Sequence, residues 1–343
     1  MNTPLSATRR PAPGSGLRTL ALVAGLAGAG AAVAQSGVTI YGIMDLGLVK
    51  PNGGTTPGAL LPGRGANPDT WTMKAGNTSR LGFRGQEDLG GGAYARFQIE
   101  HRVALDTGIP SNTTTFWLGR SVVAAGSKSA GEVYLGREYS AAYWVALNAD
   151  PTLWSYVSQT GSAYTYANYT ALPATVEASN IRWSNSVGYK SPRFGGLSVE
   201  VARALGENQR HPATSTNVQY SEGPLWLALG TDRLNRGTHM EIVAAGYDLG
   251  VVHPKASYTR AKGGLNGDAR SYTVSALVPT GFGRVFASYG RLDPKRSAES
   301  SMIGAGAQLD LSKRTLLYTN LGTARQRGFT RTTVIDAGVK HTF

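Results

Sequence analysis

Two kinds of connection alternate along this chain of 343 residues and constrain its fold more than any other feature. Seven are short and rich in Gly, Pro, Asp and Ser, the composition of tight turns; they lie at 88–92, 126–131, 191–196, 221–224, 248–250, 279–281 and 310–313. Eight are longer and more variable, at roughly 50–79, 104–113, 140–180, 205–216, 232–238, 261–269, 291–300 and 323–331. This alternation predicts an antiparallel meander with short turns at one end and long loops at the other.

These connections separate sixteen predicted strands. Their approximate positions are 38–49, 80–88, 93–103, 114–124, 132–139, 182–190, 197–204, 217–221, 225–231, 239–247, 251–260, 270–278, 282–290, 301–310, 314–322 and 332–343. The segment at 217–221 has the weakest pattern. An even strand number with turns and loops on opposite rims is typical of a bacterial outer-membrane barrel. We therefore predict an all-β fold, a 16-stranded antiparallel transmembrane β-barrel.

Side chains alternate between apolar and polar in several of these segments, for example at 197–201, 271–278, 303–310 and 333–343. The last stretch is long enough for a tilted strand to cross a bilayer and ends on an aromatic residue, Phe343. A soluble β-sandwich is the alternative, but its outer faces contact water, so an apolar outer face on every strand is not expected there. A ring of sixteen strands is also too wide for side chains to fill, so we expect an aqueous lumen.

Residues 1–34 have the composition of a secretory signal. Arg9, Arg10 and Arg18 form a positive region, residues 20–33 are apolar, and 32–34 read Ala-Val-Ala, a typical cleavage site. A transmembrane helix is the alternative, but the apolar segment is short for a span and precedes a cleavage site. We predict a signal peptide at 1–34 and a mature barrel at 35–343. Loss of three arginines and no acids lowers the net charge from +13 to +10.

Several classes of function lack the residues that they need. The chain has no cysteine, its five histidines have no metal-ligand spacing, and it contains neither a G-x-S-x-G motif nor a phosphate-binding loop. We therefore expect that the protein is not an enzyme and that it has no cofactor and no metal site. The positive charge could suggest nucleic acid. For an exported barrel, the expected counterparts are instead outer-membrane lipid, lipopolysaccharide phosphates and anions in the lumen.

Six segments together, in order along the chain, resemble Gram-negative general porins, most closely the β-proteobacterial type. They are SGVTIYGIMDLGLV at 36–49, SRLGFRGQEDLGGG at 79–92, GEVYLGR at 131–137, NSVGYKSPRFGG at 185–196, LSKRTLLY at 311–318 and GVKHTF at 338–343. The resemblance implies a homotrimer of water-filled channels for small hydrophilic solutes, inserted by the barrel assembly machinery, which recognises an aromatic-ended closing strand. It also implies that the third long loop, 140–180, folds into the lumen and faces basic residues on the wall.

Strand parity indicates which charged side chains face the lumen. Arg80 and Arg84 share one face of the segment 80–88, opposite Leu81 and Phe83, and Arg102 lies on the polar face of 93–103. A charge at mid-bilayer on the lipid face costs about 2–4 kcal/mol, so these arginines should face water.

Parity also places Arg182 with Lys190, opposite Trp183. The resemblance assigns the basic ladder of the family to Arg80, Arg120 and Arg182. Leu118 and Val122, the residues that would share a strand face with Arg120, are however apolar. For each of these arginines the alternative is a solvated or loop-pairing side chain with no effect on selectivity.

Arg137 lies with Val133 and Leu135 on the face predicted to point outward. A lipid-facing arginine is costly there, and in the family this Gly-Arg position tends to be interfacial. We therefore expect Arg137 at the trimer interface, paired with an acid of a neighbouring subunit and not in the pore.

The expected constriction loop contains few acids. Asp150 is its one central carboxylate, with Glu177 at the far end, among seven tyrosines and tryptophans at 143, 144, 154, 156, 164, 166 and 169. A basic wall that faces a nearly neutral loop should concentrate anions and exclude cations. The aromatic rings could also stack on sugars, or they could simply pack the loop against the wall.

Three functions remain open from the sequence. The first is a passive diffusion channel that favours anions, and the second is a channel selective for phosphate, organic acids or sugars. The third is a non-conducting adhesin or structural barrel, for which the long loop at 50–79 would be the contact surface.

Overall fold

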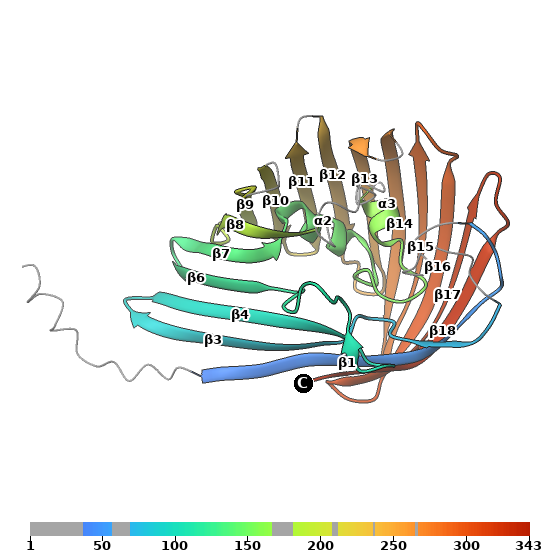
Figure 1. Cartoon of the computed structure of the whole chain (residues 1–343), viewed down its shortest axis with the longest axis horizontal. Coiled ribbons are helices and arrows are strands. Elements are labelled where there is room, and N and C mark those ends of the chain that lie inside the picture. Colours follow the sequence, from blue (N-terminus) through green and yellow to red (C-terminus); the bar gives the residue numbers. More distant parts are fainter. Residues whose placement is uncertain (1–36, 57–68, 167–180, 208–211, 236, 265–266) are drawn as a thin grey trace, which may run out of the picture. The chain divides into compact units, whose positions relative to one another are not determined.

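Antiparallel strands close into a ring in the computed structural model of this chain, which describes residues 37–56, 69–166, 181–207, 212–235, 237–264 and 267–343 (Figure 1). The predicted signal peptide lies outside these residues and stays a prediction. Within them, no helix is long and apolar enough to cross a membrane.

Sixteen strands form the wall in this described part of the chain. They are β1 (Gly37–Pro51), β3 (Arg80–Gly90), β4 (Ala93–Ala104), β6 (Ser121–Ser127), β7 (Gly131–Tyr139), β8 (Arg182–Lys190), β9 (Leu197–Ala204), β10 (Ala213–Glu222), β11 (Leu225–Asn235), β12 (Thr238–Tyr247), β13 (His253–Gly264), β14 (Gly267–Thr280), β15 (Gly283–Pro294), β16 (Ser300–Asp310), β17 (Thr315–Gln326) and β18 (Thr332–Thr342). Two short strands, β2 (Thr72–Lys74) and β5 (Ile109–Pro110), belong to the first two long loops.

Pairing between the first and last strands closes the ring. β1 pairs with β18 from Ile43–Thr342 to Pro51–Val334 and pairs on its other side with β3. Each remaining wall strand pairs with its neighbours in sequence. The predicted 16-stranded antiparallel barrel is therefore confirmed, since each described wall strand pairs with a neighbour on both sides.

Several predicted strand ends differ from those observed by a few residues, and two segments illustrate why. The weak segment at 217–221 belongs to a ten-residue strand, β10. The segment predicted at 114–124 begins its strand only at Ser121. Its earlier residues pack aromatic rings instead: Phe116 stacks on His101, and Trp117 lies edge-on to Phe83. An apolar run therefore formed a side-chain cluster where periodicity had suggested a strand.

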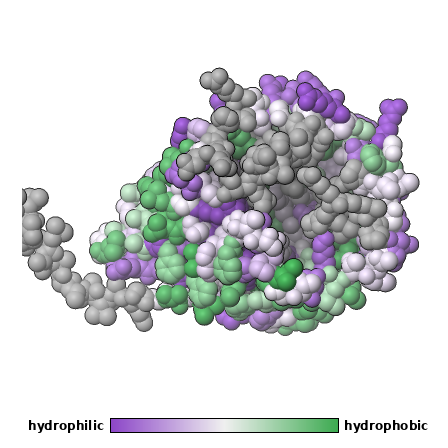
Figure 2. Space-filling view, viewed as in Figure 1, coloured by the Kyte–Doolittle hydropathy of each residue, from purple (hydrophilic) through white to green (hydrophobic). Residues whose placement is uncertain are grey.

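Apolar side chains lie on the outside of the wall. In β18 the outward positions Ile335 and Val339 are 42% and 43% exposed in the protomer, whereas Asp336 faces inward and is buried. Figure 2 shows hydrophilic residues along the upper and right rim and hydrophobic ones toward the lower left. This alternation of apolar-out and polar-in positions suits a barrel with lipid outside and water inside.

The height of the wall is uneven. β6 to β9 contain seven to nine residues each, whereas β10 to β18 contain ten to fourteen. A tilted strand needs about 9–11 residues to cross a bilayer. We call β6 to β9 the low wall.

Inward tyrosines cover glycines on the neighbouring strand. Tyr134 lies directly opposite Gly188 in the β7–β8 pair, and a Cβ on Gly188 would collide with the tyrosine ring. Tyr41 covers Gly82 and Tyr318 covers Gly338 in the same way. Each glycine thus leaves the space that the ring of its partner fills.

We predict that Gly188→Ala destabilises the barrel, because the added methyl group would overlap the Tyr134 ring. Overpacking of this kind typically costs about 1–3 kcal/mol. The measurement is the temperature at which the purified protein loses its folded mobility on a gel. Gly281→Ala is the matched control, because a Cβ there meets nothing within 4 Å; equal melting of the two variants would contradict the prediction.

Candidate functional site: a constriction between an inner loop and a basic wall

The third long loop folds into the barrel, as predicted. It carries two helices, α2 (Ala141–Ala149) and α3 (Gly161–Thr165), which lie inside the ring of strands (Figure 1). Residues 167–180 of the expected loop, including Tyr169 and Glu177, lie outside the described residues.

Small residues let α2 lie close to the wall. Ala142, Val145 and Ala146 are buried against it, and the Cα of Ala142 lies 3.0 Å from where a Cβ on Gly230 would be. The Ser140 side chain caps the helix by accepting from the Tyr143 N–H. Gly230 of the wall thus leaves room for the helix to lie close.

Polar groups of the wall bind the backbone of α2 at both ends. Ser215 Oγ accepts the N–H of Ala142 at 3.0 Å. At the other end, Lys255 Nζ donates to the Asn148 carbonyl at 2.7 Å. A cation at the last carbonyls of a helix satisfies free acceptors and interacts favourably with the helix dipole.

Carboxylates of the wall bind the rest of the loop. Asp336 accepts the N–H of Val157 at 3.0 Å, and Asn320, which donates to Asp336, also accepts from the Ser158 hydroxyl at 3.1 Å. Asp232 accepts hydrogen bonds from both Ser140 and Tyr166. All these groups are buried, so each hydrogen bond both holds the loop and satisfies a buried donor.

Asp150 holds the loop from within. Its side chain is fully buried. The carboxylate accepts from the N–H and hydroxyl of Thr152, and from the Thr160 hydroxyl and the Gly161 N–H at 2.8 and 2.9 Å. The one central acid of the loop therefore acts as an internal hydrogen-bond acceptor and is screened from the lumen.

The turn after Asp150 has an unusual backbone. Leu153, Trp154 and Tyr156 have φ angles of 53, 55 and 67°, in the left-handed region that bulky residues seldom adopt. Such conformations cost about 1–3 kcal/mol each and persist only where surrounding contacts fix them. The Tyr156 N–H donates to the Gly76 carbonyl at 2.7 Å, which is one such contact.

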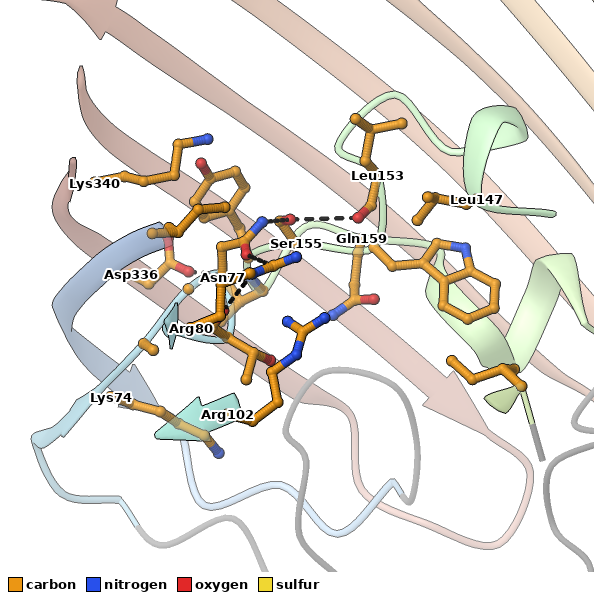
Figure 3. Close-up of a pocket in the computed structure, with 18 of the residues that line it drawn as sticks. Lys74, Asn77, Arg80, Arg102, Leu147, Leu153, Ser155, Gln159, Asp336 and Lys340 are labelled. Atoms are coloured by element: carbon orange, nitrogen blue, oxygen red, sulfur yellow. Dashed lines mark hydrogen bonds between the residues drawn. The ribbon is translucent and has the colours of Figure 1, made fainter. Parts of the chain in front are cut away.

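A cavity of about 440 Å³ lies between this loop and the wall (Figure 3). The loop contributes apolar, aromatic and neutral polar side chains, namely Tyr143, Leu147, Leu153, Trp154, Ser155, Tyr156, Val157 and Gln159. Burial raises the pKa of Tyr143 and of Tyr156, so both hydroxyls stay neutral at physiological pH. Among the described residues, the charged side chains that line the cavity are five cations and one acid, namely Lys74, Arg80, Arg102, Arg182, Lys340 and Asp336.

Three predicted arginines line this cavity. Arg102 and Arg182 both donate to the Tyr139 hydroxyl at 2.8 Å, and Arg102 also pairs with Glu100 at 2.7 Å. Arg80 bonds to the Asn77 side chain at 2.5 Å and has no ion pair within the described residues. The structure thus brings Arg80, Arg102 and Arg182 together.

Arg120 and Arg84 lie on the same inner wall but do not line the cavity. Arg120 donates to Glu138 at 2.8 Å, and its guanidinium lies 5.0 Å from the Trp144 ring centroid. Arg84 is exposed and lies 5.2 Å above the Tyr41 ring. Arg120 has a carboxylate beside it, so its charge acts less on a passing ion than that of Arg80.

A bulge interrupts the parity of β8. Gly136 pairs with Ser186, but the next pair is Glu138 with Trp183, and Asn185 between them has a φ of 52°. Trp183 is consequently buried instead of facing outward. Simple alternation therefore does not hold along the whole of β8.

Arg137 lies at this bulge on the low wall and is only 6% exposed in the protomer. It donates to the Leu118 carbonyl at 3.3 Å and to the Ser184 hydroxyl at 2.8 Å. These contacts hold the stretch before β6 against the bulge of β8.

Four polar residues of the site, Lys74, Asn77, Asp336 and Lys340, were not among the predicted site residues. Asp336 and Lys340 could have been found, because both fall on the polar face of the last predicted strand. Lys74 and Asn77 lie in the first long loop, where no periodicity indicates which side chains point inward.

Comparisons with known proteins agree with this architecture. A family model described as Gram-negative porin matches residues 19–328. Outer membrane porin protein 32 of Delftia acidovorans is 31% identical over 90% of each chain, and an outer membrane porin protein of Bordetella pertussis is 27% identical over 95% of this chain and all of its own. The solved anion-selective porin from Comamonas acidovorans has a TM-score of 0.75 and 26% identity over 90% of this chain and 100% of its own.

The chain belongs to the Gram-negative porin family. It is a passive channel of the Gram-negative outer membrane for small solutes and not an enzyme. These relatives also confirm the β-proteobacterial type that the sequence motifs suggested.

We predict that Gly304→Ala displaces the constriction loop. A Cβ at this wall position would overlap the Ser158 carbonyl oxygen, so backbone must move. The expected result is a change in single-channel conductance, with the barrel still folded. Gly37→Ala, where a Cβ meets nothing within 4 Å, is the control; conductance of Gly304→Ala equal to that of the control would contradict the prediction.

Proposed function

We propose that this channel favours anions over cations. The observation that carries the proposal is the charge of the cavity between loop and wall, which is lined, within the described part of the chain, by five cations and one acid. That acid, Asp336, is held by hydrogen bonds from Asn320 and Val157. Rings of Arg or Lys are the usual device of anion-conducting pores.

The inner loop supports the same preference. Its central acid, Asp150, is fully buried, and its hydrogen bonds within the described residues come from the loop itself. The described side chains that the loop turns toward the cavity are neutral. The basic wall therefore repels a cation in the passage, and the loop offers it little compensating attraction. An anion is attracted.

We further propose that three protomers associate through the low wall. Its strands are shorter than most of the others, and Val123, Val133 and Leu135 on its outer face are about half exposed. A neighbouring protomer would cover this surface, near the buried Arg137.

Chemical crosslinking of the purified protein should give a ladder that ends at three subunits, and a ladder that ends at one or two would contradict the proposal. Contact with lipopolysaccharide and insertion by the barrel assembly machinery stay predictions.

A solute-selective channel is the second candidate. The observation in its favour is the group of aromatic rings at the cavity, where Tyr139 and Tyr143 stack at 4.3 Å and Trp154 lies edge-on to Tyr143. Rings beside arginines suit a flat or carboxylated solute. The two candidates can be separated by adding a solute and measuring the ion current. A solute at low concentration should reduce the current through a selective channel and leave the current through a general channel unchanged.

We predict that Arg80→Ala weakens the anion preference. Loss of one charge about 4 Å from a passing ion changes its energy by about 1 kcal/mol in water. The measurement is the reversal potential in a planar bilayer under a KCl gradient, which should favour chloride for the wild type and move toward zero for the variant.

Arg314→Ala is the matched control for this experiment. Arg314 is an exposed arginine in the turn between β16 and β17, so its loss removes the same charge away from the cavity and from the low wall. A reversal potential that favours potassium in the wild type, or an equal shift in both variants, would contradict the proposed selectivity.

A further inference from the structure

The first wall strand faces an irregular stretch between β2 and β3. β1 pairs with β2 up to Gly47–Lys74 and with β3 from Ile43–Arg80. The three residues 44–46 of β1 therefore face five residues, 75–79, which we call the 75–79 bulge. Bulges of this kind redirect side chains and often lie beside functional sites.

Asp45 of β1 holds the 75–79 bulge. Its carboxylate, which is fully buried, accepts the N–H of Gly76 at 2.8 Å and the Tyr318 hydroxyl at 2.8 Å. Its backbone N–H and carbonyl each bond to the Ser79 hydroxyl at 3.0 Å. The Gly76 carbonyl then accepts the Tyr156 N–H of the constriction loop. The bulge is thus fixed to the wall on one side and to the loop on the other.

Asn77 connects this bulge to the pore arginine. Its Oδ1 accepts from Arg80 Nη2 at 2.5 Å, and its Nδ2 donates to Ser155 Oγ of the loop at 2.6 Å. The other hydrogen bond of Arg80 runs from Nε to the Thr78 carbonyl at 3.2 Å. Within the described residues, both hydrogen bonds that orient the guanidinium therefore come from the 75–79 bulge, and Figure 3 shows Arg80 beside Asn77.

We propose that Asn77 is a positioning residue for ion selectivity, which holds the Arg80 guanidinium at the cavity and ties it to the constriction loop. This inference rests on the proposed anion preference. An amide suits the role because it accepts a hydrogen bond from arginine and leaves the positive charge uncompensated. A carboxylate in its place would form an ion pair and neutralise the charge.

Three variants separate this role from a merely structural one. Asn77→Asp has nearly the same shape and keeps both contacts, because the Ser155 hydroxyl can donate to the carboxylate. Asn77→Ala removes both contacts. Ser155→Ala removes the link to the loop and leaves the bond to Arg80. Each is compared with the wild type and Arg80→Ala by reversal potential under a KCl gradient, after a gel has confirmed the folded barrel.

We expect Asn77→Asp to lower the ratio of chloride to potassium permeability about fivefold, as far as Arg80→Ala does, because one unit of charge is cancelled near the ion in either case. Asn77→Ala should lower the ratio by a smaller factor, since the guanidinium stays charged but loses its fixed position. Ser155→Ala should leave the ratio at the wild-type value.

Two results would overturn the inference. One is an unchanged permeability ratio in Asn77→Asp while Arg80→Ala lowers it, which means that Asn77 does not act on Arg80. The other is an equal fall in Ser155→Ala and Asn77→Ala, which means that loop anchoring alone matters. A wild-type channel without anion preference would instead contradict the proposed function. Failure of the proposed function can therefore be distinguished from failure of the role proposed for Asn77.

Discussion

The architecture of the pore depends on hydrogen bonds between carboxylates of the barrel wall and the segments that project inward. Asp45 accepts the N–H of Gly76, Asp336 accepts that of Val157, and Asp232 accepts the hydroxyls of Ser140 and Tyr166. Hydrogen bonds to an ionised acceptor are roughly twice as strong as neutral ones. Loss of any one carboxylate would leave buried donors unsatisfied, at about 1–3 kcal/mol each.

This use of the acids determines the charge that a solute meets. Asp150 is enclosed by the loop that it stabilises, and Asp336 faces the Asn320 amide and the Val157 N–H. Arg80 and Arg102, in contrast, line the cavity; Arg80 bonds to neutral groups of the 75–79 bulge, whereas Arg102 bonds to Tyr139 and pairs with Glu100. The same hydrogen bonds that fix the loop therefore leave the passage with an excess of positive charge.

Much of the fold could be predicted from the sequence because each strand of a barrel repeats one simple pattern. The boundaries of β8 and β9 agree with the prediction residue for residue, and the inward face of β18 follows from alternation alone. The bulge at Asn185 could not be predicted, since it depends on pairing between β7 and β8 and not on periodicity. For the same reason parity could not place Asn77, which lies in a bulge that Asp45, on another strand, holds in place.

The wall carboxylates therefore hold the inner loop, whereas the wall arginines set the charge of the passage. A change at Asp336 alters charge and loop position together, because its oxygens hold the Val157 N–H. A change at Arg80 alters mainly charge, because its hydrogen bonds within the described residues go to the 75–79 bulge and reach the loop only through Asn77. Selectivity can thus vary through Arg80, while the carboxylates keep the loop in place.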